Sequence, residues 1–290
     1  MTVKTTVPCL MAMAVLAVLA AVRPVHAQSG PGSTLAMRPL WELGAGAAAI
    51  RLPDYRGSDQ KRSYLLPVPY FVYRGVRFKA DRNGVRTTLF DSDRIDLSLS
   101  ANATLPVSSH NNAARSGMAD LKPTVELGPI LSLNVWQSAA QDMKLDLRAP
   151  LRTSLTLERS PRQIGWVFAP NLNLDIRDPA GFTGWNLGML AGPLFSTRRY
   201  NQYFYSVGAA DATGTRPAYD APGGYSGSQF TLALSKRYAH YWVGGFLCYD
   251  RLAGARFESS PLVRQNDAVS VGFAVSWIFG ESARKVDASE

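Results

Sequence analysis

The sequence predicts an all-β protein, a transmembrane antiparallel up-and-down β-barrel of about twelve strands. Three observations lead to this fold class. Many segments alternate apolar and polar residues with a period of two, which gives a β-strand one apolar face and one polar face. No segment beyond the N-terminal leader is apolar for long enough to form a transmembrane helix. The leader itself has the pattern of a secretion signal, which predicts export.

The N-terminal leader has the three parts of a secretory signal peptide. Lys4 supplies the positive charge, residues 10–21 form a short apolar run, and Val25-His26-Ala27 occupies the cleavage positions. A transmembrane anchor is the alternative, but the run is short and no stop-transfer flank follows it. We therefore expect residues 1–27 to be removed, and the bacterial outer membrane to be the destination of a barrel exported in this way.

Composition and charge fit an exported membrane protein better than a nucleic-acid-binding protein. The formal charge of +9 falls by two, to +7, when Lys4 and Arg23 leave with the signal. The basic residues are scattered and form no basic helix or aromatic–basic motif, so no nucleic-acid partner is expected. Outer-membrane lipid and lipopolysaccharide are the expected partners. Cys248 is the only cysteine after cleavage, which excludes an intramolecular disulfide.

Period-two alternation divides the mature chain of about 260 residues into one domain of about twelve strands. In the clearest strand, residues 143–157, Leu145 and Leu147 face one way while Lys144 and Asp146 face the other. The expected strands are 41–50, 64–73, 76–80, 85–90, 95–105, 121–135, 143–157, 164–177, 185–195, 230–237, 241–250 and 268–279. The barrel therefore spans residues 41–279, between a short flexible leader at 28–40 and a polar C-terminal tail at 280–290.

The connections between these strands alternate in length along the chain. The links of one set are mostly long: 51–63, 81–84, 106–120, 158–163, 196–229 and 251–267. The links of the other set are short: 74–75, 91–94, 136–142, 178–184 and 238–240. Outer-membrane barrels show this asymmetry, with long extracellular loops and short periplasmic turns. The alternation predicts an even strand number with the N- and C-termini both periplasmic.

Five prolines fall inside the expected strands, where the missing N–H group interrupts a ladder of hydrogen bonds. They are Pro123, Pro129, Pro150, Pro170 and Pro193. We expect bulges or other local irregularity at these positions. The leader and the tail carry Gly, Ser and charged residues, and we expect both to be mobile.

Catalytic motifs are absent from the sequence. His110 and His240 lie in different links at opposite ends of the expected barrel, so they cannot share a metal or a triad. Ser108 and Ser109 adjoin His110, but neighbours on an extended loop point apart, which leaves an enzyme of lipid or murein only as a reserve hypothesis. No G-x-S-x-G, H-E-x-x-H or P-loop pattern occurs. The sequence therefore predicts no enzyme, no metal and no cofactor.

The lumen is the remaining candidate site, because charged residues share the polar face of neighbouring strands. These candidate lumen charges are Lys122, Glu126, Lys144, Asp146, Arg148, Arg152, Asp175 and Arg177. Opposite charges can pair and plug the interior, or they can line a narrow water path. Plugging is favoured because the two signs interleave. The long links also carry cations that can meet lipopolysaccharide phosphates: Arg51, Arg56, Lys61, Arg62, Arg198, Arg199 and Arg264. Acidic residues in the same links dilute that charge: Asp54, Asp59, Asp211, Asp220 and Asp267.

Several segments, in order along the mature chain, match one known family. They are Pro53-Asp54-Tyr55-Arg56-Gly57-Ser58, Pro67-Val68-Pro69, Asp91-Ser92, Tyr203-Phe204-Tyr205-Ser206-Val207, Pro217-Ala218-Tyr219-Asp220, Ser260-Pro261-Leu262-Val263 and Gly272 with Ser276-Trp277-Ile278-Phe279. On these residues the chain resembles the MipA/OmpV family of outer-membrane proteins, the MltA-interacting protein family. The family pattern commonly ends at the closing aromatic residue, so the tail after Phe279 departs from it.

The resemblance implies an outer-membrane barrel without catalytic residues. The named member of the family is a scaffold that brings a murein-degrading lytic transglycosylase together with a murein synthase, which links it to cell-wall growth. Other members are discussed as porin-like or adhesive proteins. The alternative expectation is therefore a narrow porin-like channel or a surface receptor or adhesin.

Overall fold

The computed structural model describes residues 37–74, 78–81, 84–87, 90–91 and 94–287, and the expected signal peptide lies outside them. The long strands are β2 (Trp41–Pro53), β3 (Lys61–Arg74), β7 (Ile95–Thr104), β8 (Thr124–Gln137), β9 (Met143–Thr156), β12 (Trp185–Ser196), β13 (Gly224–Arg237), β14 (Tyr241–Arg251) and β15 (Asp267–Glu281). The shorter strands are β4 (Phe78–Asp81), β5 (Gly84–Thr87), β6 (Phe90–Asp91), β10 (Gln163–Phe168) and β11 (Asn171–Arg177). Among the described residues, no helix has the length and apolar character needed to cross a membrane.

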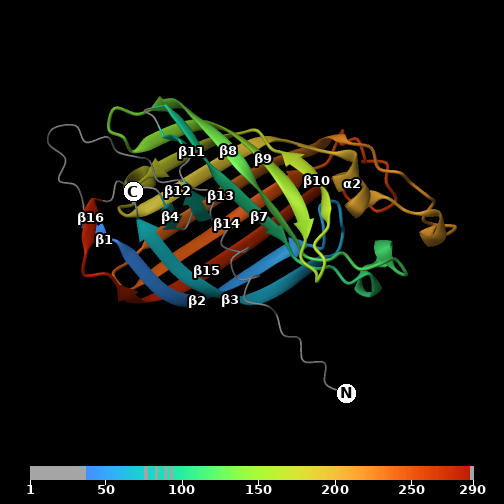
Figure 1. Ribbon diagram of the computed structural model, residues 1–290, viewed down its shortest axis with the longest axis horizontal. Helices are drawn as coiled ribbons and strands as arrows, with labels where there is room; N and C mark the ends of the chain where they lie inside the picture. The colour runs from blue at the N-terminus through green and yellow to red at the C-terminus, as the bar shows by residue number, and fades with distance from the viewer. Residues whose placement is uncertain (1–36, 75–77, 82–83, 88–89, 92–93, 288–290) are drawn as a thin grey trace, which may run out of the picture.

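These strands form one antiparallel sheet that curves into a barrel (Figure 1). Strands that follow one another in the chain are paired, and the last long strand, β15, returns to pair with β2. This is the up-and-down order that the sequence predicts. The sheet has two free ends, β3 to β5 and β6 to β7; β5 packs against β7, but no ladder joins these ends in the part of the chain that the structure describes. The described barrel is therefore not closed by hydrogen bonds at this seam.

Exposure along the strands confirms that apolar side chains face outward. Glu126 is 2% exposed, whereas its neighbour Leu127 is 46% exposed. The same alternation holds on β9, where Asp146 is buried and Leu147 is exposed. Successive side chains of a strand point to opposite faces, so the charged face looks into the barrel and the apolar face looks outward. This inverted arrangement is that of a barrel surrounded by hydrocarbon.

Three of the five prolines lie at the irregularities that the sequence predicts. The expected strand 164–177 is split at Ala169-Pro170 into β10 and β11, both of which pair with β9 and β12. The register of β12 on β13 shifts just after Pro193. Pro123 lies before β8 instead of within it. At these three positions the missing donor lies at a break, a bulge or outside the strand. Pro129 and Pro150 remain within β8 and β9 without a register shift, so the prediction of irregularity is wrong for these two.

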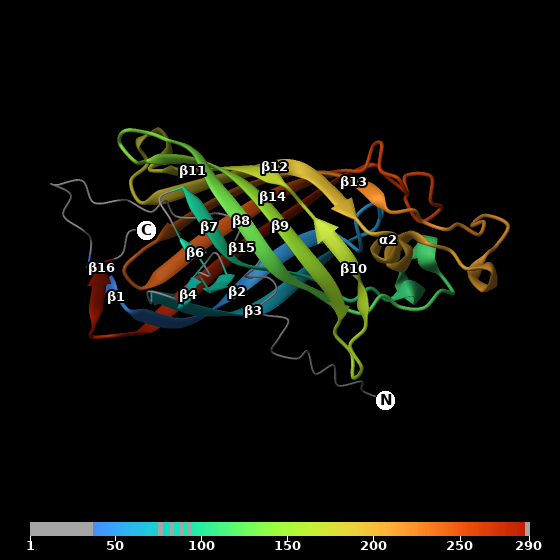
Figure 2. The same ribbon diagram turned by 45° about the horizontal axis from the view of Figure 1, so that its top comes forward.

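The two ends of the barrel differ in the way the alternating link lengths predict. The long connections gather at one end, where they carry the helix α2 (Arg198–Tyr205) and the 3₁₀ turns η1 (Ser109–Asn111), η2 (Ala113–Arg115) and η4 (Ala209–Asp211). The short turns lie at the opposite end, which both ribbon views show (Figures 1 and 2). The turn before β12 there includes η3 (Pro179–Gly181). We keep as a prediction that the short-turn end is periplasmic.

Parts of the leader and the tail are ordered against each other, contrary to the mobility that the sequence predicts for both segments. β1 (Met37–Pro39) and β16 (Lys285–Asp287) pair as a two-stranded sheet at the short-turn end of the barrel (Figure 1). The backbone N–H of Leu40 donates to the Arg284 carbonyl (2.9 Å) and to Ser282 Oγ (2.8 Å). The pairing of β15 with β2 explains this contact, because it brings the two flanking segments side by side.

Candidate functional site in the lumen and loop cap

One side of the lumen, which we call the polar wall, is formed by the inward faces of β7, β8, β9 and β11. At its centre Arg148 Nη2 lies 3.2 Å from Asp175 Oδ2 and 3.6 Å from Asp146 Oδ2. Lys144 Nζ lies 3.2 Å from Asp146 Oδ1. Asp146 and Arg148 share a face of β9, and the register of β11 on β9 places Asp175 beside them. Arg148 and both carboxylates are buried, so their charges stabilise one another in a low-dielectric interior.

A second ion pair connects the polar wall to the loops. Arg152 Nε lies 3.1 Å from Glu126 Oε2, and Arg152 Nη1 donates to Ser100 Oγ (3.2 Å). Tyr200 of α2 donates its phenolic proton to the other carboxylate oxygen, Glu126 Oε1 (2.9 Å). The helix of the longest loop is therefore fixed by a hydrogen bond onto the interior of the barrel.

Six of the eight residues that the sequence singles out meet in these two groups. They are Glu126, Lys144, Asp146, Arg148, Arg152 and Asp175. The other two lie outside them: Lys122 precedes β8 with an exposed side chain, and Arg177 is half-buried at the end of β11.

A third buried ion pair was missed by sequence reasoning. Glu42 Oε1 lies 3.2 Å from Arg237 Nη2, and Glu42 Oε2 accepts a hydrogen bond from Tyr70 Oη (2.9 Å). Glu42 is fully buried on the inward face of β2, at the short-turn end. In the sequence, Glu42 is a single charged residue on a strand face that continues with Gly and Ala. Its partner, Arg237 on β13, is far away in the chain, so no local pattern predicts the pair.

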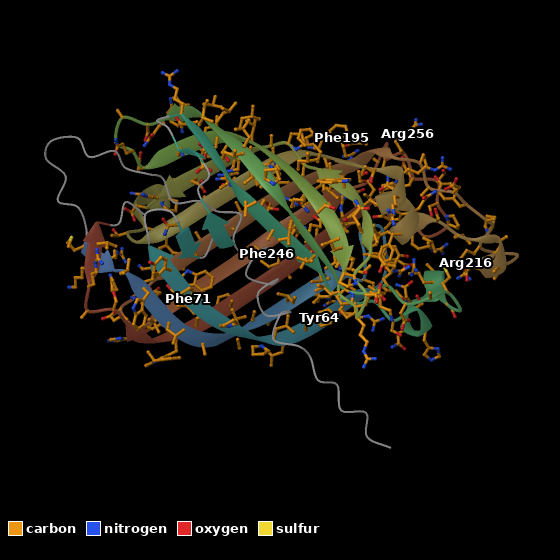
Figure 3. All side chains as sticks on the ribbon, viewed as in Figure 1. Tyr64, Phe71, Phe195, Arg216, Phe246 and Arg256 are labelled. Atoms are coloured by element: carbon orange, nitrogen blue, oxygen red, sulfur yellow. The ribbon has the colours of Figure 1, made fainter. Side chains whose placement is uncertain are left out.

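The opposite side of the lumen is an apolar wall, formed by the inward faces of β2, β3, β13, β14 and β15. Its buried side chains are Ala48, Ile50, Val68, Tyr70, Val72, Ala233, Trp242, Phe246, Cys248, Ala274 and Ile278. Figure 3 shows Phe246 within the barrel. A Cβ atom at Gly272 would lie 2.2 Å from Phe246 Cε1 and 2.9 Å from Ile50 Cγ2, so glycine makes room for the ring. This wall packs like the core of a soluble protein.

The loops at the long-loop end form a compact unit, which we call the loop cap (residues 54–60, 105–123, 157–162, 197–223 and 252–266). Its apolar core, to which β10 adds Ile164, contains Tyr55, Val107, Leu121, Phe204, Tyr205, Val207, Ala221, Leu252, Ala255, Phe257 and Leu262. The rings of Tyr205 and Phe257 are stacked with centroids 3.8 Å apart. Tyr55 Oη donates to the Leu262 carbonyl (2.8 Å), and Ser260 Oγ donates to the Tyr205 carbonyl (2.6 Å). The loops are thus joined to one another across their sequence separation.

Buried arginines hold the loop cap together and join it to the barrel. Arg115 donates to the carbonyl groups of Phe204 (3.1 Å) and Ala119 (3.2 Å). Arg56 Nε lies 2.7 Å from Asp250 Oδ1 on β14. Arg216, at the long-loop end in Figure 3, donates to three loop carbonyl groups. Each guanidinium has five N–H donors, so it can donate to several loop carbonyl groups that have no partner in a β-ladder.

The family comparison decides the identity of this fold. A family model described as "MltA-interacting protein MipA" matches residues 45–279. The chain belongs to this family. It is an outer-membrane β-barrel protein, which agrees with the apolar exterior of its strands. The comparison with curated proteins finds no significant match.

Solved structures of outer-membrane proteins are similar to this MipA-family chain only at a distance. A "Bacterial polysaccharide outer membrane secretin" gives a TM-score of 0.40 at 9% identity, covering 82% of this chain and 99% of the other. The outer membrane phospholipase A from Escherichia coli gives 0.34 at 10% identity, covering 92% and 97%. The CymD monoaromatic hydrocarbon channel gives 0.32 at 10% identity, covering 84% and 90%. At these TM-scores the neighbours carry no argument about function.

Four of the segments that carry the resemblance to the MipA family meet in the loop cap, where Tyr219 of the segment 217–220 forms a β-bridge with Val207. The segment 53–58 contributes Tyr55 and Arg56, the segment 203–207 is the end of α2, and the segment 260–263 supplies the carbonyl group that Tyr55 binds. Gly57 has a φ of +94°, which L-residues rarely adopt, and its carbonyl accepts the Arg264 N–H (2.7 Å). These segments of the MipA-family chain therefore specify the structure of its cap.

Burial also sets the ionisation of the cap residues in this MipA-family protein. Burial raises the pKa of Tyr55 from 10.0 to about 12, partly offset by the nearby Arg115 cation. Burial likewise raises the pKa of Tyr205, against the charge of Arg56. Both phenols therefore stay neutral across the physiological pH range, and each keeps the proton that it donates in the cap.

The two histidines in the described part of the chain lie at opposite ends of the barrel. His110 is exposed in η1 at the long-loop end, and His240 lies in the turn before β14, where its ring stacks on Trp277 at 6.5 Å. In the described ranges, no three His, Cys, Asp or Glu residues are placed to hold a metal ion. Cys248 is buried on the apolar wall.

Proposed function

We propose that this MipA-family protein is a non-catalytic scaffold of the outer membrane, which binds a murein-degrading lytic transglycosylase and a murein synthase during cell-wall growth. The observation that supports the proposal is the burial of the inward-facing side chains on both walls of the described barrel. Ion pairs occupy the polar wall, and an apolar core occupies the other wall. A barrel with such an interior presents its outer surfaces for function.

The family description supports binding to a murein enzyme, because the family is that of an MltA-interacting protein. Murein lies in the periplasm, so the partner surface on this proposal is the short-turn end. That end offers the turns 138–142, 178–184 and 238–240 together with the β1–β16 sheet. The ordered β1–β16 sheet enlarges a surface that short turns alone would leave small.

Binding and cross-linking test the proposal together. The full chain in detergent is immobilised and exposed to a purified lytic transglycosylase at moderate salt, with an unrelated outer-membrane barrel as the control. Single cysteines are placed in a Cys248→Ser background at Ala139 in a short turn and at Gly214 in the loop cap. We expect specific retention of the enzyme and cross-links from the Ala139 position. No retention beyond the control barrel, or cross-links from the Gly214 position alone, contradicts the proposal.

A narrow channel is the second candidate, because the polar wall carries buried polar atoms without a protein partner. Ser132 Oγ, Ser154 Oγ and Asn173 Oδ1 are buried on its inward face without a hydrogen bond. Such atoms usually bind internal water. If the water forms a continuous path, planar bilayers show steady conductance that changes in Arg148→Ala or Arg152→Ala. Silent bilayers containing correctly folded protein exclude this candidate.

A further inference from the structure

Five exposed cationic side chains line the barrel rim from β3 round to β13, where the strands enter the loop cap. Arg51 on β2, Lys61 on β3 and Arg251 on β14 stand at exposed, outward-facing positions. Arg256 and Arg264 follow in the loop between β14 and β15 and are also exposed. Figure 3 shows Arg256 at this end of the molecule. We call these five residues the rim cations.

In the sequence, acidic residues of the loops offset the positive charge of the loop cations. In the structure, several of these acids pair with arginines other than the rim cations. Asp54 pairs with Arg62 (2.6 Å), Asp250 pairs with Arg56 (2.7 Å), and Asp220 pairs with Arg198. In the described part of the chain, none of the rim cations forms an ion pair. Three acids lie in the same part of the rim. Asp59 is exposed, Asp267 stands opposite Arg251 in the β14–β15 ladder and accepts the Tyr249 hydroxyl proton, and Glu258 accepts from Gly254 N and Asn266 Nδ2. This part of the rim therefore keeps a net positive charge.

Apolar side chains lie directly below the rim cations on the outer surface. Leu65 on β3 is 77% exposed, and Val271 on β15 and Leu247 on β14 are also exposed. A surface that is apolar along the strands and cationic at their ends matches a lipid with acyl chains and an anionic headgroup.

The sector of the rim from β12 round to β9 has a different character. There the exposed cations Arg162 and Arg198 pair with Glu158 and Asp220. The strand ends carry the exposed aromatic residues Trp166, Phe168 and Phe195 instead of cations. Aromatic side chains at this depth fit any membrane interface, whatever the headgroup charge. Within the described residues, exposed cations that face outward from the strand ends themselves therefore occur in one sector, whereas the cations Lys122, Arg159 and Arg199 of the other sector lie in loops.

We propose that the rim cations bind the phosphate groups of lipopolysaccharide in the outer leaflet. Neighbouring strands lie about 4.8 Å apart, so β3 to β14 span roughly 14 Å of rim, enough for more than one phosphate. Arginine and lysine bind phosphate by charge-assisted hydrogen bonds, and the apolar side chains below them contact the acyl chains. The inference rests on the predicted orientation, with the loop cap outside the cell, and is independent of the scaffold function.

Native mass spectrometry of lipid bound to the full chain in detergent tests this site. The probe is phosphorylated lipid A, compared with the same lipid after removal of its phosphates and with inorganic phosphate as a competitor. The test variant carries Arg51→Gln, Lys61→Gln and Arg251→Gln. The matched control carries Arg159→Gln, Arg162→Gln and Arg198→Gln, which removes the same charge from exposed positions of the sector from β12 round to β9.

We expect the test variant to weaken binding of phosphorylated lipid A at least about tenfold, since each rim cation contributes about a factor of five near an anionic lipid surface. The control variant should keep nearly wild-type binding, and dephosphorylated lipid should bind both variants equally. Equal losses in the two triple variants, or binding that does not depend on the phosphates, overturn the proposal. Full displacement by inorganic phosphate also overturns it, because the site would then recognise the free anion instead of the lipid.

Labelling of whole cells separates this proposal from the scaffold function. An impermeant maleimide should label Gly214→Cys but not Ala139→Cys, both in the Cys248→Ser background. The reverse pattern places the rim in the inner leaflet, which lacks lipopolysaccharide, and overturns the inference. The binding of a murein enzyme is decided separately by its own retention experiment.

Discussion

The two walls of the lumen fill the same barrel by different means. The apolar wall packs Phe246, Trp242 and Ile50 in one contiguous core, whereas the polar wall pairs Arg148 and Arg152 with carboxylates on neighbouring strands. Burial of apolar surface is favourable wherever it occurs, at roughly 25 cal/mol per Å². A buried ion pair gains little net energy but is costly to break. The comparison teaches that the interior of a membrane barrel can combine a soluble-type core with an ionic one.

The largest expected effect comes from breaking the ionic wall at its centre. Arg148→Met leaves Asp146 and Asp175 buried without their arginine, which should cost about 3–5 kcal/mol of unfolding free energy. Arg162→Met, which breaks an exposed pair with Glu158, should cost at most about 1 kcal/mol. Guanidinium unfolding in detergent, followed by tryptophan fluorescence, measures both variants. If Arg148→Met and Arg162→Met lose the same free energy of unfolding, the charges of the polar wall are in contact with water and do not depend on their ion pairs.

Truncation of a large side chain tests the apolar wall. Phe246→Ala removes a ring from the packed interior and should cost about 3 kcal/mol, from lost burial and the cavity left behind. Phe273→Ala is the matched change on the outward face of β15, where the ring is 55% exposed, and it should cost much less. The same unfolding assay compares them. A larger loss in the outward variant would mean that the interior at Phe246 is not packed.

Enlarging a glycine tests the same wall with a smaller effect. Gly272→Val forces a side chain against Phe246 and Ile50, and overpacking of this kind costs about 1–3 kcal/mol. Gly214→Val in the loop cap meets no atom within 4 Å of the added Cβ and should be nearly neutral. Thermal unfolding in detergent reports the difference. A neutral Gly272→Val would reveal free space beside Phe246.

The smallest expected effect is that of high pH, which should destabilise the loop cap and leave the stability of the barrel nearly unchanged. The neutral phenol of Tyr55 is favoured in the folded cap, so the unfolded chain ionises first, near pH 10.0, and the folded cap only near 12. The stabilisation that the neutral Tyr55 phenol gives to the cap is therefore fully present below pH 10.0 and is lost as the pH rises toward 12. Protease cleavage within residues 197–223 should rise over this window. A cleavage rate that does not change between pH 10.0 and 12 contradicts the burial of Tyr55. The Tyr55→Phe variant should show a smaller change of the cleavage rate with pH.

The sequence predicts the barrel well where the two faces of a strand differ. Lys144, Asp146 and Arg148 alternate with leucine and alanine, so the face of β9 that looks inward can be read directly. β14 gives a weaker signal, because Trp242 and Phe246 face inward while Val243 and Leu247 face outward. Both faces are apolar there, so period-two alternation identifies the strand without revealing that its inner face is a core.

Other features depend on contacts that no local pattern contains. Glu42 on β2 and Arg237 on β13 meet over the inner face of the sheet only because β15 returns to pair with β2. The apolar core of the loop cap joins loops that are far apart in sequence and have no periodicity, so Phe257 and Leu262 read as ordinary loop residues. The pairing of Met37–Pro39 with Lys285–Asp287 likewise depends on the ends of the barrel being adjacent.

A spin-label scan of β14 tests the arrangement of the two faces most directly. Single cysteines replace Trp242, Val243, Phe246 and Leu247 in turn, in a Cys248→Ser background, and the labelled protein is placed in lipid bilayers. Collisions with dissolved oxygen report contact with hydrocarbon, and collisions with a polar nickel complex report contact with water. We expect high oxygen accessibility at Val243 and Leu247, and low accessibility to both reagents at Trp242 and Phe246. Nickel accessibility at the inward positions, or oxygen accessibility without period-two alternation, would contradict a filled barrel with a lipid-facing exterior.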